Sequence, residues 1–562
     1  MAGAPLRSGC QPARGGQGAP ATAFVRMNRP PAAGMMDGVN AGRLCGSGSR
    51  RRAQNHGAAR GWWQTGARLG TGVALIAGLS GCSFTIPLHL PPVPAGTGYT
   101  ARRAPRVLAA VPGGAPAQRL RYGQVARVRW WTLLQSRALD RLVARALQDS
   151  PTIAQAQAQL REAQANMAVN ASIFYPQVTG GLSASRNKTS GASFGGRFPG
   201  ITYSLFSGDV AVSYYPDFFG VNRLIYQGSR AQMLYQRDER DAARLTLAGN
   251  VVDSAVGAAA TQAQIQATKA SVHDQRALLV LAQAQYASGA QAYSTVVDQR
   301  SQLLAVQAQL VPLRQQLAVY RHQLAILTGS FPGQWRTRPL TMADLHEPRV
   351  VPVALPSALV RHRPDIEAAT EQMRYAIAQI GVARAQFFPT VTLSATLGTS
   401  ALRTGQFFNP ISRVWGIAAD LVQPLFEGGR LRAQKRVAYA AFDATFALYR
   451  SVVLDAFAQV ADALRALEHD ARAVAIDRLA LGAAQTTHAL AQAGYRAGST
   501  DYLAVLAADV TVQNARAALA RARALRLQDT VALFVALGGD DWAARRPAAG
   551  AEPVAHRRQG SS

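Results

Sequence analysis

The sequence holds few residue combinations that could support catalysis. Residues Gly191–Gly195 (GASFG) match the G-x-S-x-G pattern of serine hydrolases. That pattern works only where a strand precedes the serine, a helix follows it, and a histidine and an acid lie nearby. Here it lies in a Gly/Ser-rich link between two alternating segments, where a loop is expected. We therefore predict that the protein is not an enzyme.

Nucleotide and metal sites are no better supported. No glycine stands at P-loop spacing before any of the three lysines, Lys188, Lys269 and Lys435. The nine histidines show no H-E-x-x-H or paired-ligand spacing. No close pair occurs among the three cysteines, Cys10, Cys45 and Cys82, so they predict neither a disulfide framework nor a metal site. We expect no cofactor.

The formal charge of +29 suggests a nucleic-acid partner, but its distribution does not. No Asp or Glu lies between Asp37 and Asp140, so much of the excess is in the N-terminal quarter. The arginines are dispersed among Ala, Gly and Pro, without a basic run interleaved with aromatics. We predict no nucleic-acid binding.

Cys82 is the residue whose surroundings indicate a covalent modification. Arg60 and Arg68 precede the uncharged stretch Leu69–Leu79, which ends in Ser80-Gly81-Cys82. A basic flank, a short apolar core and a small-residue exit form a secretory signal too short to span a bilayer. The L-S-G-C ending resembles the bacterial lipobox, which implies a diacylglycerol and an N-acyl chain on Cys82. The alternative is an ordinary signal in which Cys82 is incidental.

The residues around this signal complete the N-terminal assignment. Ser83 rather than Asp follows the cysteine, and the resemblance to lipoproteins then implies sorting to the outer membrane. Residues 1 to about 55 are too long for the basic region of a signal, so we infer that translation starts further downstream. N-terminal sequencing of the unprocessed product tests this. We assign 1–81 to an extension and signal peptide, and 82–129 to the lipid anchor and an extended tether.

The remainder of the chain is a duplication. Five landmarks recur in one order at offsets of 208 to 213 residues: Pro151 with Pro364, Pro176 with Pro389, Gly220 with Gly428, Tyr286 with Tyr495, and Gly329 with Gly539. We predict a first structural repeat at 130–335, a linker at 336–355, a second repeat at 356–539, and a disordered tail at 540–562.

Each repeat contains a helical stretch followed by two candidate strands. The helical stretches run over about 138–171 and 357–386. In 177–185 and 390–397 apolar residues alternate with hydroxyl residues, which predicts strands that face two different solvents. Return strands follow at about 209–215 and 415–422, and the alternation of the second is ambiguous.

Long helices follow the strands. Residues 224–287 and 431–497 contain no proline, which at ~1.5 Å per residue allows on the order of 95 Å of helix. Apolar residues recur at coiled-coil spacing in the second of them: Val453, Phe457, Val460, Leu464 and Leu467. Gly289 and Gly498 end the long helices, and a shorter helix returns in each repeat.

Four strands cannot close into a barrel, and an open sheet edge in lipid leaves backbone groups without partners. We therefore predict that the strands pair across subunits, and three chains would supply twelve strands around an aqueous pore. The fold class is α+β membrane protein: two β-hairpins per chain contribute four strands to a trimeric 12-stranded transmembrane barrel. The long coiled-coil helices form a periplasmic α-barrel.

The sequence resembles the TolC-like outer-membrane efflux proteins, in particular the OprM/NodT-type lipoprotein branch. The resemblance covers about 129–539 and rests on these stretches: Trp130-Trp131, Leu355–Leu359, Arg363–Ile366, Gly381–Ala385, Phe387–Pro389 and Gln423–Arg430. It implies a homotrimer in the outer membrane, lipid-anchored and with its helical body in the periplasm. It also implies docking to a membrane-fusion adaptor and to an inner-membrane transporter of the RND type or similar.

The resemblance also directs attention to the tip of the helices. In such channels an Asp after the Tyr-x-x-Gly landmark of the second repeat helps to close the periplasmic entrance, and here that position is Ala507. The corresponding position of the first repeat is Asp298. Three such carboxylates around a threefold axis would attract cations. Gate candidates are therefore Asp298 and, with weaker support, Asp501 and Asp509; the alternative is that all three are solvated helix-end carboxylates.

The function implied is the passive exit duct of a tripartite efflux pump for drugs or other small toxic molecules. A duct for type I protein secretion remains an alternative. A periplasmic coiled-coil scaffold without a pore would share the helical stripes but not the two-faced hairpins. The transported substrates are not encoded in these patterns, because the inner-membrane partner usually selects them.

Overall fold

The computed structural model describes residues 87–88, 98–100, 102, 105–109, 117–124, 129–195 and 199–539. All of these residues belong to one unit, Thr71–Ser562. The predicted signal, the lipidation site at Cys82 and the C-terminal tail lie outside the described residues.

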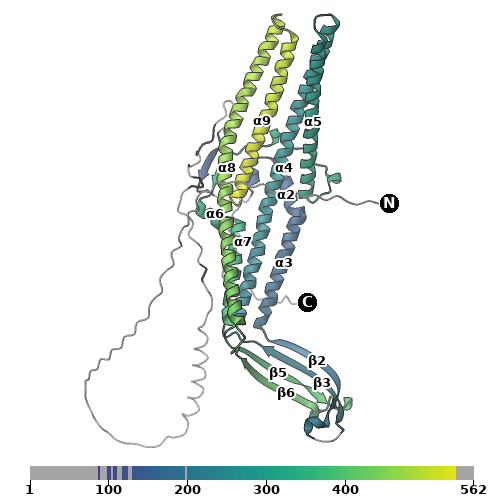
Figure 1. Ribbon diagram of the computed structural model, residues 1–562, viewed down its shortest axis with the longest axis vertical. Coiled ribbons are helices and arrows are strands. Elements are labelled where there is room, and N and C mark those ends of the chain that lie inside the picture. Colours follow the sequence, from purple (N-terminus) through teal and green to yellow (C-terminus); the bar gives the residue numbers. More distant parts are fainter. Residues whose placement is uncertain are drawn as a thin grey trace, which may run out of the picture. The chain divides into compact units, whose positions relative to one another are not determined.

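Two helical hairpins of matching size dominate the described unit (Figure 1). The long helices α4 (Val221–Ala287) and α8 (Arg430–Arg496) have 67 residues each, and the returning helices α5 (Tyr293–Leu327) and α9 (Tyr502–Ala536) have 35 each. The turns between them contain Gly289 and Gly498 at φ 76° and 71°, a backbone region that glycine adopts without steric cost. The predicted rods and their glycine breaks are confirmed.

The two shorter helical stretches are each divided by a proline. The helical stretch predicted over about 138–171 is present as two helices, α2 (Arg137–Asp149) and α3 (Pro151–Ala171). Likewise, 357–386 contains α6 (Pro356–His362) and α7 (Pro364–Ala385). Proline restricts the residue before it to extended backbone and lacks the N–H that would continue the preceding helix, so Ser150 and Arg363 interrupt the helices.

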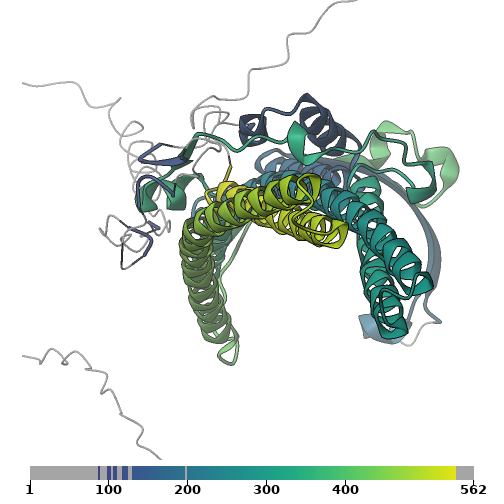
Figure 2. The ribbon, with the colours of Figure 1, turned by 90° about the horizontal axis from the view of Figure 1, so that it is seen from above.

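The long helices stand side by side and form a curved wall, seen from above in Figure 2. Beside the sheet the order is α3, α4, α7 and α8, and toward the tip it is α5, α4, α9 and α8. Helix α5 contributes a stripe of buried leucines and one valine at seven-residue spacing: Val296, Leu303, Leu310, Leu317 and Leu324. This spacing is the coiled-coil seam that joins α5 to α4.

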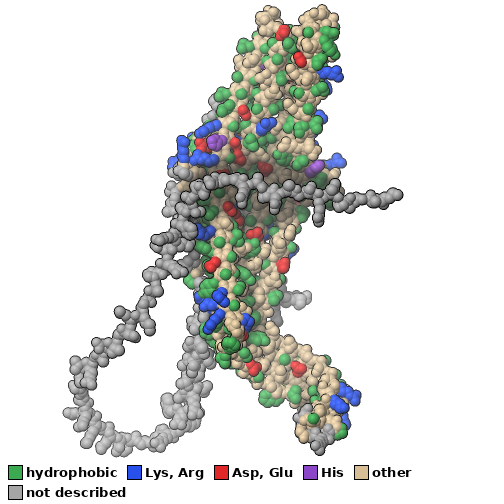
Figure 3. All heavy atoms as spheres, in the orientation of Figure 1, with side chains coloured by type: hydrophobic (Ala, Val, Ile, Leu, Met, Phe, Trp, Pro, Cys, Tyr) green, Lys and Arg blue, Asp and Glu red, His purple; other side chains and the backbone are tan. Residues whose placement is uncertain are grey.

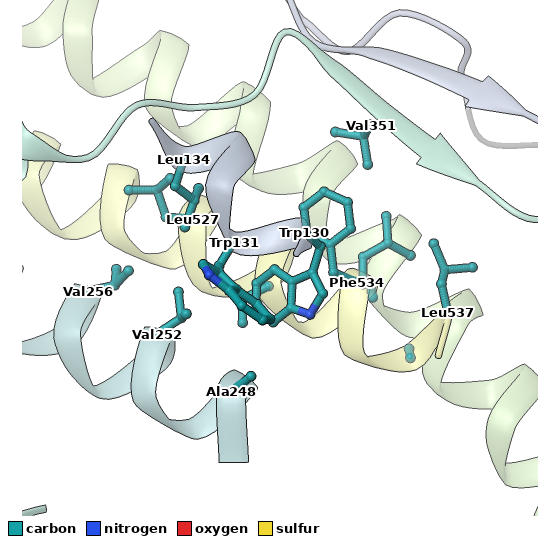
Figure 4. Close-up of a cluster of buried hydrophobic side chains, with 14 of the residues drawn as sticks. Trp130, Trp131, Leu134, Ala248, Val252, Val256, Val351, Leu527, Phe534 and Leu537 are labelled. Carbon is teal, nitrogen blue, oxygen red and sulfur yellow. The ribbon is translucent and has the colours of Figure 1, made fainter. Parts of the chain in front are cut away.

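A compact core lies on the convex side of the wall, halfway along it. Trp130 is 1% exposed and stacks on Phe534 of α9, with ring centroids 5.5 Å apart (Figure 4). Trp131 packs edge-on against Trp130 at 5.8 Å. Trp130 and Trp131 thus pack at the start of the folded body.

A small parallel sheet in this core was missed from the sequence. Strands β1 (Arg119–Tyr122) and β4 (Val350–Val353) pair with each other. They lie within the segments that the sequence assigned to an extended tether and a linker, so part of each is folded. Arg526 of α9, 1% exposed, fastens this region to the wall: it donates to Gln118 Oε1 at 3.0 and 3.1 Å and contacts Glu347 Oε2 at 3.0 Å.

The two β-hairpins form one four-stranded antiparallel sheet in the order β2-β3-β5-β6. Its strands are β2 (Gln177–Thr189), β3 (Ile201–Tyr214), β5 (Thr390–Ala401) and β6 (Arg413–Val422). The strands were predicted at these places but are longer than the alternating patterns. The GASFG motif forms a single 3₁₀ turn in the β2–β3 connection, followed by a strand and not by a helix.

Among the described helices, one has a window long and apolar enough to cross a membrane by composition, and it is α8. Only 11% of that window is buried within the chain. Large apolar side chains of this helix, such as Leu448 and Leu454, are exposed in the part of the chain that the structure describes.

Candidate functional site

The two faces of the sheet differ in chemistry. Residues directly opposite each other in an antiparallel ladder point to the same side. Val210 lies opposite Leu397, which in turn lies opposite Trp415. These three residues, and every second residue from them along their strands, therefore lie on the same face of the sheet. The central part of this face is apolar and comprises Val178, Leu182, Ala184, Phe206, Val210, Val212, Tyr214, Val391, Leu393, Ala395, Leu397, Trp415, Ile417, Ala419 and Leu421.

The opposite face carries mainly hydroxyl and carboxylate groups in its central part. Ser183 and Ser207 lie hydroxyl to hydroxyl at 3.2 Å across the first hairpin. The other polar members are Thr179, Ser185, Asp209, Ser213, Thr392, Ser394, Thr396 and Asp420. The register therefore confirms the alternation of apolar and polar residues in these strands. It also resolves the ambiguous strand, because Trp415, Ile417 and Leu421 of β6 belong to the apolar face.

Both outer strands have an unpaired edge among the described residues, and most of the apolar face is exposed there. Strands β2 and β6 each pair on one side only. Leu182, Ile417 and Trp415 are 85%, 79% and 76% exposed. A soluble monomer rarely exposes so continuous an apolar surface, and its unpaired strand edges would need water or another strand. With 10 to 14 residues, each strand is long enough to cross a bilayer.

The tip of the wall repeats itself in detail. Tyr286 and Tyr293 flank the first turn with ring centroids 5.3 Å apart, and Tyr495 and Tyr502 flank the second at the same distance. Asp501 accepts a hydrogen bond from the Ala504 N–H at 2.9 Å and so caps the N-terminus of α9. Asp298 is exposed on the second turn of α5, and Ala507 is exposed on α9.

Asp509 lies deeper in the wall than the other gate candidates. Its carboxyl is half-buried, 3.9 Å from His488 Nε2 of α8 and 3.4 Å from the amide of Gln513. It also shares a side-chain hydrogen bond with the carboxyl of Asp274 on α4. Within one chain, therefore, the three candidates do not converge: Asp501 caps a helix, Asp509 joins helices, and Asp298 is solvated.

These features match a known family along most of the chain. The family model described as "Outer membrane efflux protein" matches residues 142–330 and 355–539. The chain belongs to the outer membrane efflux protein family. The TolC-like resemblance is thereby confirmed, as is location in the outer membrane with the helical body in the periplasm.

The names of relatives in this family refer to different transported substances. The chain is 32% identical over 427 residues to the pyoverdine export outer membrane protein OpmQ of Pseudomonas putida, covering 75% of this chain and 89% of that one. It is 27% identical to the toluene efflux pump outer membrane protein TtgF of P. putida, covering 83% and 96%. It is 24% identical to the cation efflux system protein CusC of Escherichia coli, covering 73% and 88%.

Solved members of the outer membrane efflux family share the fold. The outer-membrane channel OprN superposes with a TM-score of 0.70 at 25% identity, covering 81% of this chain and 99% of that one. VceC from Vibrio cholerae gives 0.64 at 26% identity, covering 74% and 100%.

The carboxyl pairs inside the helical wall of this family member were missed from the sequence. Burial, and then the nearby Asp509 carboxyl, raises the pKa of Asp274 from 3.8 to about 7. Asp470 of α8 is paired in the same way with Asp529 of α9, and burial is again the main cause that raises its pKa to about 7. The sequence held only a weak signal for the burial of Asp274, which is that it lies among the buried residues Ser271, Gln275, Leu278 and Ala282 of α4. Its partner Asp509 is evident only from the packing of α4 on α9.

Metal binding has no support in the described part of the chain. No three His, Cys, Asp or Glu side chains there are placed to hold a metal ion. One Asp274 oxygen, Oδ2, is buried without a hydrogen-bond partner, which disfavours the ionised form of this carboxyl.

Replacing Asp274 by Asn should flatten the pH dependence of stability. The folded chain holds a proton on Asp274 up to about pH 7, whereas the unfolded chain releases it near 3.8. Stability therefore falls as pH rises through this window, and the loss is complete above about pH 7. Between about pH 5 and pH 8 the melting temperature of the detergent-solubilised protein should fall a few degrees less in the variant, because the Asn amide donates to Asp509 at every pH.

The control is His488→Gln, which removes the imidazole 3.9 Å from Asp509 and leaves both carboxyls in place. The control should retain the slope of the wild-type curve. Equal slopes for the wild type and Asp274→Asn would show that the carboxyl pair does not hold a proton at neutral pH.

Proposed function

We propose that three copies of the chain assemble into the exit duct of a tripartite efflux pump. Their sheets would join edge to edge into a 12-stranded transmembrane barrel, with the polar faces lining the pore and the apolar faces in lipid. Their helical walls would join into a periplasmic tube whose lumen is the concave side seen in Figure 2. The duct is passive, and an inner-membrane transporter of the RND type or similar supplies the energy through a periplasmic adaptor.

The observation that carries this proposal is the combination of a two-faced sheet with two open edges. Such a sheet is stable in a bilayer only if each β2 edge pairs with a β6 edge and the lumen is wet. The uncovered apolar window of α8 supports the same assembly, because a neighbouring wall would bury it.

Small molecules are the cargo class that the relatives favour, since their names refer to pyoverdine, toluene and cations. The lipid anchor at Cys82 remains a prediction from the sequence. It would tether each protomer to the membrane that its own strands cross.

Cysteines on the two edges should cross-link neighbouring chains. Strand β2 leads away from the helices and β6 leads back, so an edge pair would be antiparallel. Thr179 and Asp420 both lie on the polar face, each two residues inside the helix-proximal end of its strand. In a chain carrying Thr179→Cys and Asp420→Cys, with Cys10 and Cys45 replaced by Ser, mild oxidation of outer membranes should yield covalent trimers on denaturing gels.

Thr179→Cys is also combined with Ala418→Cys or Val422→Cys, to include edge pairs shifted by two residues. Both positions lie on the same face of β6 as Asp420. Thr179→Cys with Ser394→Cys is the matched control: both residues face the lumen, but β3 separates them within the chain. Efficient cross-linking in the control, or none at any edge pair, would contradict the closed trimeric barrel.

We also propose that Asp298 contributes a ring of charge at the periplasmic entrance. Replacing Asp298 by Ala should lower the cation-to-anion permeability ratio in planar bilayers by roughly two- to threefold, because three charges leave the threefold axis together. Asp501→Asn is the comparison, since asparagine retains the helix cap while removing a tip charge. Unchanged conductance and selectivity in Asp298→Ala would reject the assignment.

A further inference from the structure

Basic side chains gather on α8 just where the helical wall meets the sheet (Figure 3). Arg432, Lys435 and Arg436 are exposed in the first two turns of α8 and line an open groove of about 860 Å³. The groove also contains Phe387 and Tyr439. In the described part of the chain, none of the three cations has an ion-pair partner within 4 Å, although Asp443 lies at the end of the groove.

The groove is a built feature and lies within one chain. Arg384, in the last turn of α7, donates to the Tyr439 hydroxyl and lies over its ring, 5.6 Å from the centroid. Phe387 follows the end of α7, so the groove lies over the seam between α7 and α8 rather than at the free edge of the wall. Ile380 and Phe442 close that seam from inside.

The basic groups face the convex side of the wall. Steps of seven residues from Arg436 lead to Asp443, Arg450 and Phe457, which therefore lie on one side of α8. The Phe457 ring lies 5.6 Å from that of Tyr99, whose hydroxyl donates to the Ala354 carbonyl at 2.9 Å beside β4. The β1–β4 pair lies on the convex side in Figure 2, so the groove opens away from the lumen.

An apolar and aromatic layer separates this groove from the sheet. Leu425 and Phe426, in the connection from β6 to α8, are 92% and 89% exposed, and Tyr175 before β2 is 70% exposed. From the start of α8 to Arg436 the helix rises about 9 Å, which is comparable to the headgroup region of a bilayer. Apolar strand, aromatic layer and cations thus follow one another in the order of acyl chain, interface and headgroup.

We propose that the groove of Arg432, Lys435 and Arg436 binds the phosphate of an anionic glycerophospholipid in the periplasmic leaflet of the outer membrane. The acyl chains of that lipid lie along Leu425, Phe426 and the apolar face of β6. The inference rests on the sheet spanning the membrane. It adds a specific lipid contact that fixes the depth of each protomer and that no pore-lining residue supplies.

The test uses the purified full-length trimer in detergent and native mass spectrometry with added dioleoyl-phosphatidylglycerol or dioleoyl-phosphatidylcholine. The wild type should retain the anionic lipid roughly tenfold better than the zwitterionic one, since each cation near the headgroup adds to the attraction. The triple variant Arg432→Gln/Lys435→Gln/Arg436→Gln should lose this preference. Arg300→Gln/Arg314→Gln/Arg321→Gln, which removes three exposed cations of α5, should retain it.

Further measurements distinguish a lipid site from a site for free anions. Excess inorganic phosphate should not displace the lipid, because the acyl contacts are part of the site; displacement would identify a free-anion site and overturn the proposal. The charge-conserving variant Arg432→Lys/Arg436→Lys should keep the preference even if the triple variant fails to assemble. No preference in the wild type, or a preference unchanged in the triple variant, overturns the proposal. Trimer mass and ion conductance, recorded on the same samples, report separately on the duct itself.

Discussion

The backbone hydrogen-bonding groups on the outer sides of β2 and β6 constrain the rest of this structure. In water such edges could be solvated, but the apolar face of the same sheet excludes water from one side. Only another sheet edge supplies hydrogen-bond partners to these groups in surroundings that exclude water. The need for a further copy of the chain therefore follows from four strands and their alternation, before any property of the helices is considered, and the proposed trimer meets that need.

The helices fit this requirement because the duplication gives each hairpin the same support. Helices α4 and α8 are equal in length, as are α5 and α9, so the two hairpins of the sheet are carried by walls of equal height. The convex core then fixes the two repeats to one another through Trp130, Phe534 and the Arg526–Glu347 contact. The wall can therefore curve as one body while its free faces stay available to neighbouring copies.

Periodic features of the fold were predictable from the sequence, and features that depend on partners remote in the chain were not. The hairpins, the long helices and the turns between them follow from local alternation, the absence of proline, and the glycines at 289 and 498. The pairing of β1 with β4 joins segments about 230 residues apart, each only four residues long, and neither has a distinctive pattern. Arg526 and Gln118 are 408 positions apart, so their contact exists only after the wall and the convex core have packed.

Contacts between remote residues also separate the acidic residues that the sequence placed together as gate candidates. Position along the chain placed Asp298, Asp501 and Asp509 in one group, because all three follow a tip landmark. Packing separates them: Asp509 reaches Asp274 across α4 and α9, while Asp470 reaches Asp529 across α8 and α9. Helix α9 is thus joined to both of its neighbours by carboxyl pairs that hold a proton near neutral pH. An ion pair at these positions would fix α9 over a wider pH range, whereas a shared proton makes the attachment of this inner helix depend on periplasmic acidity.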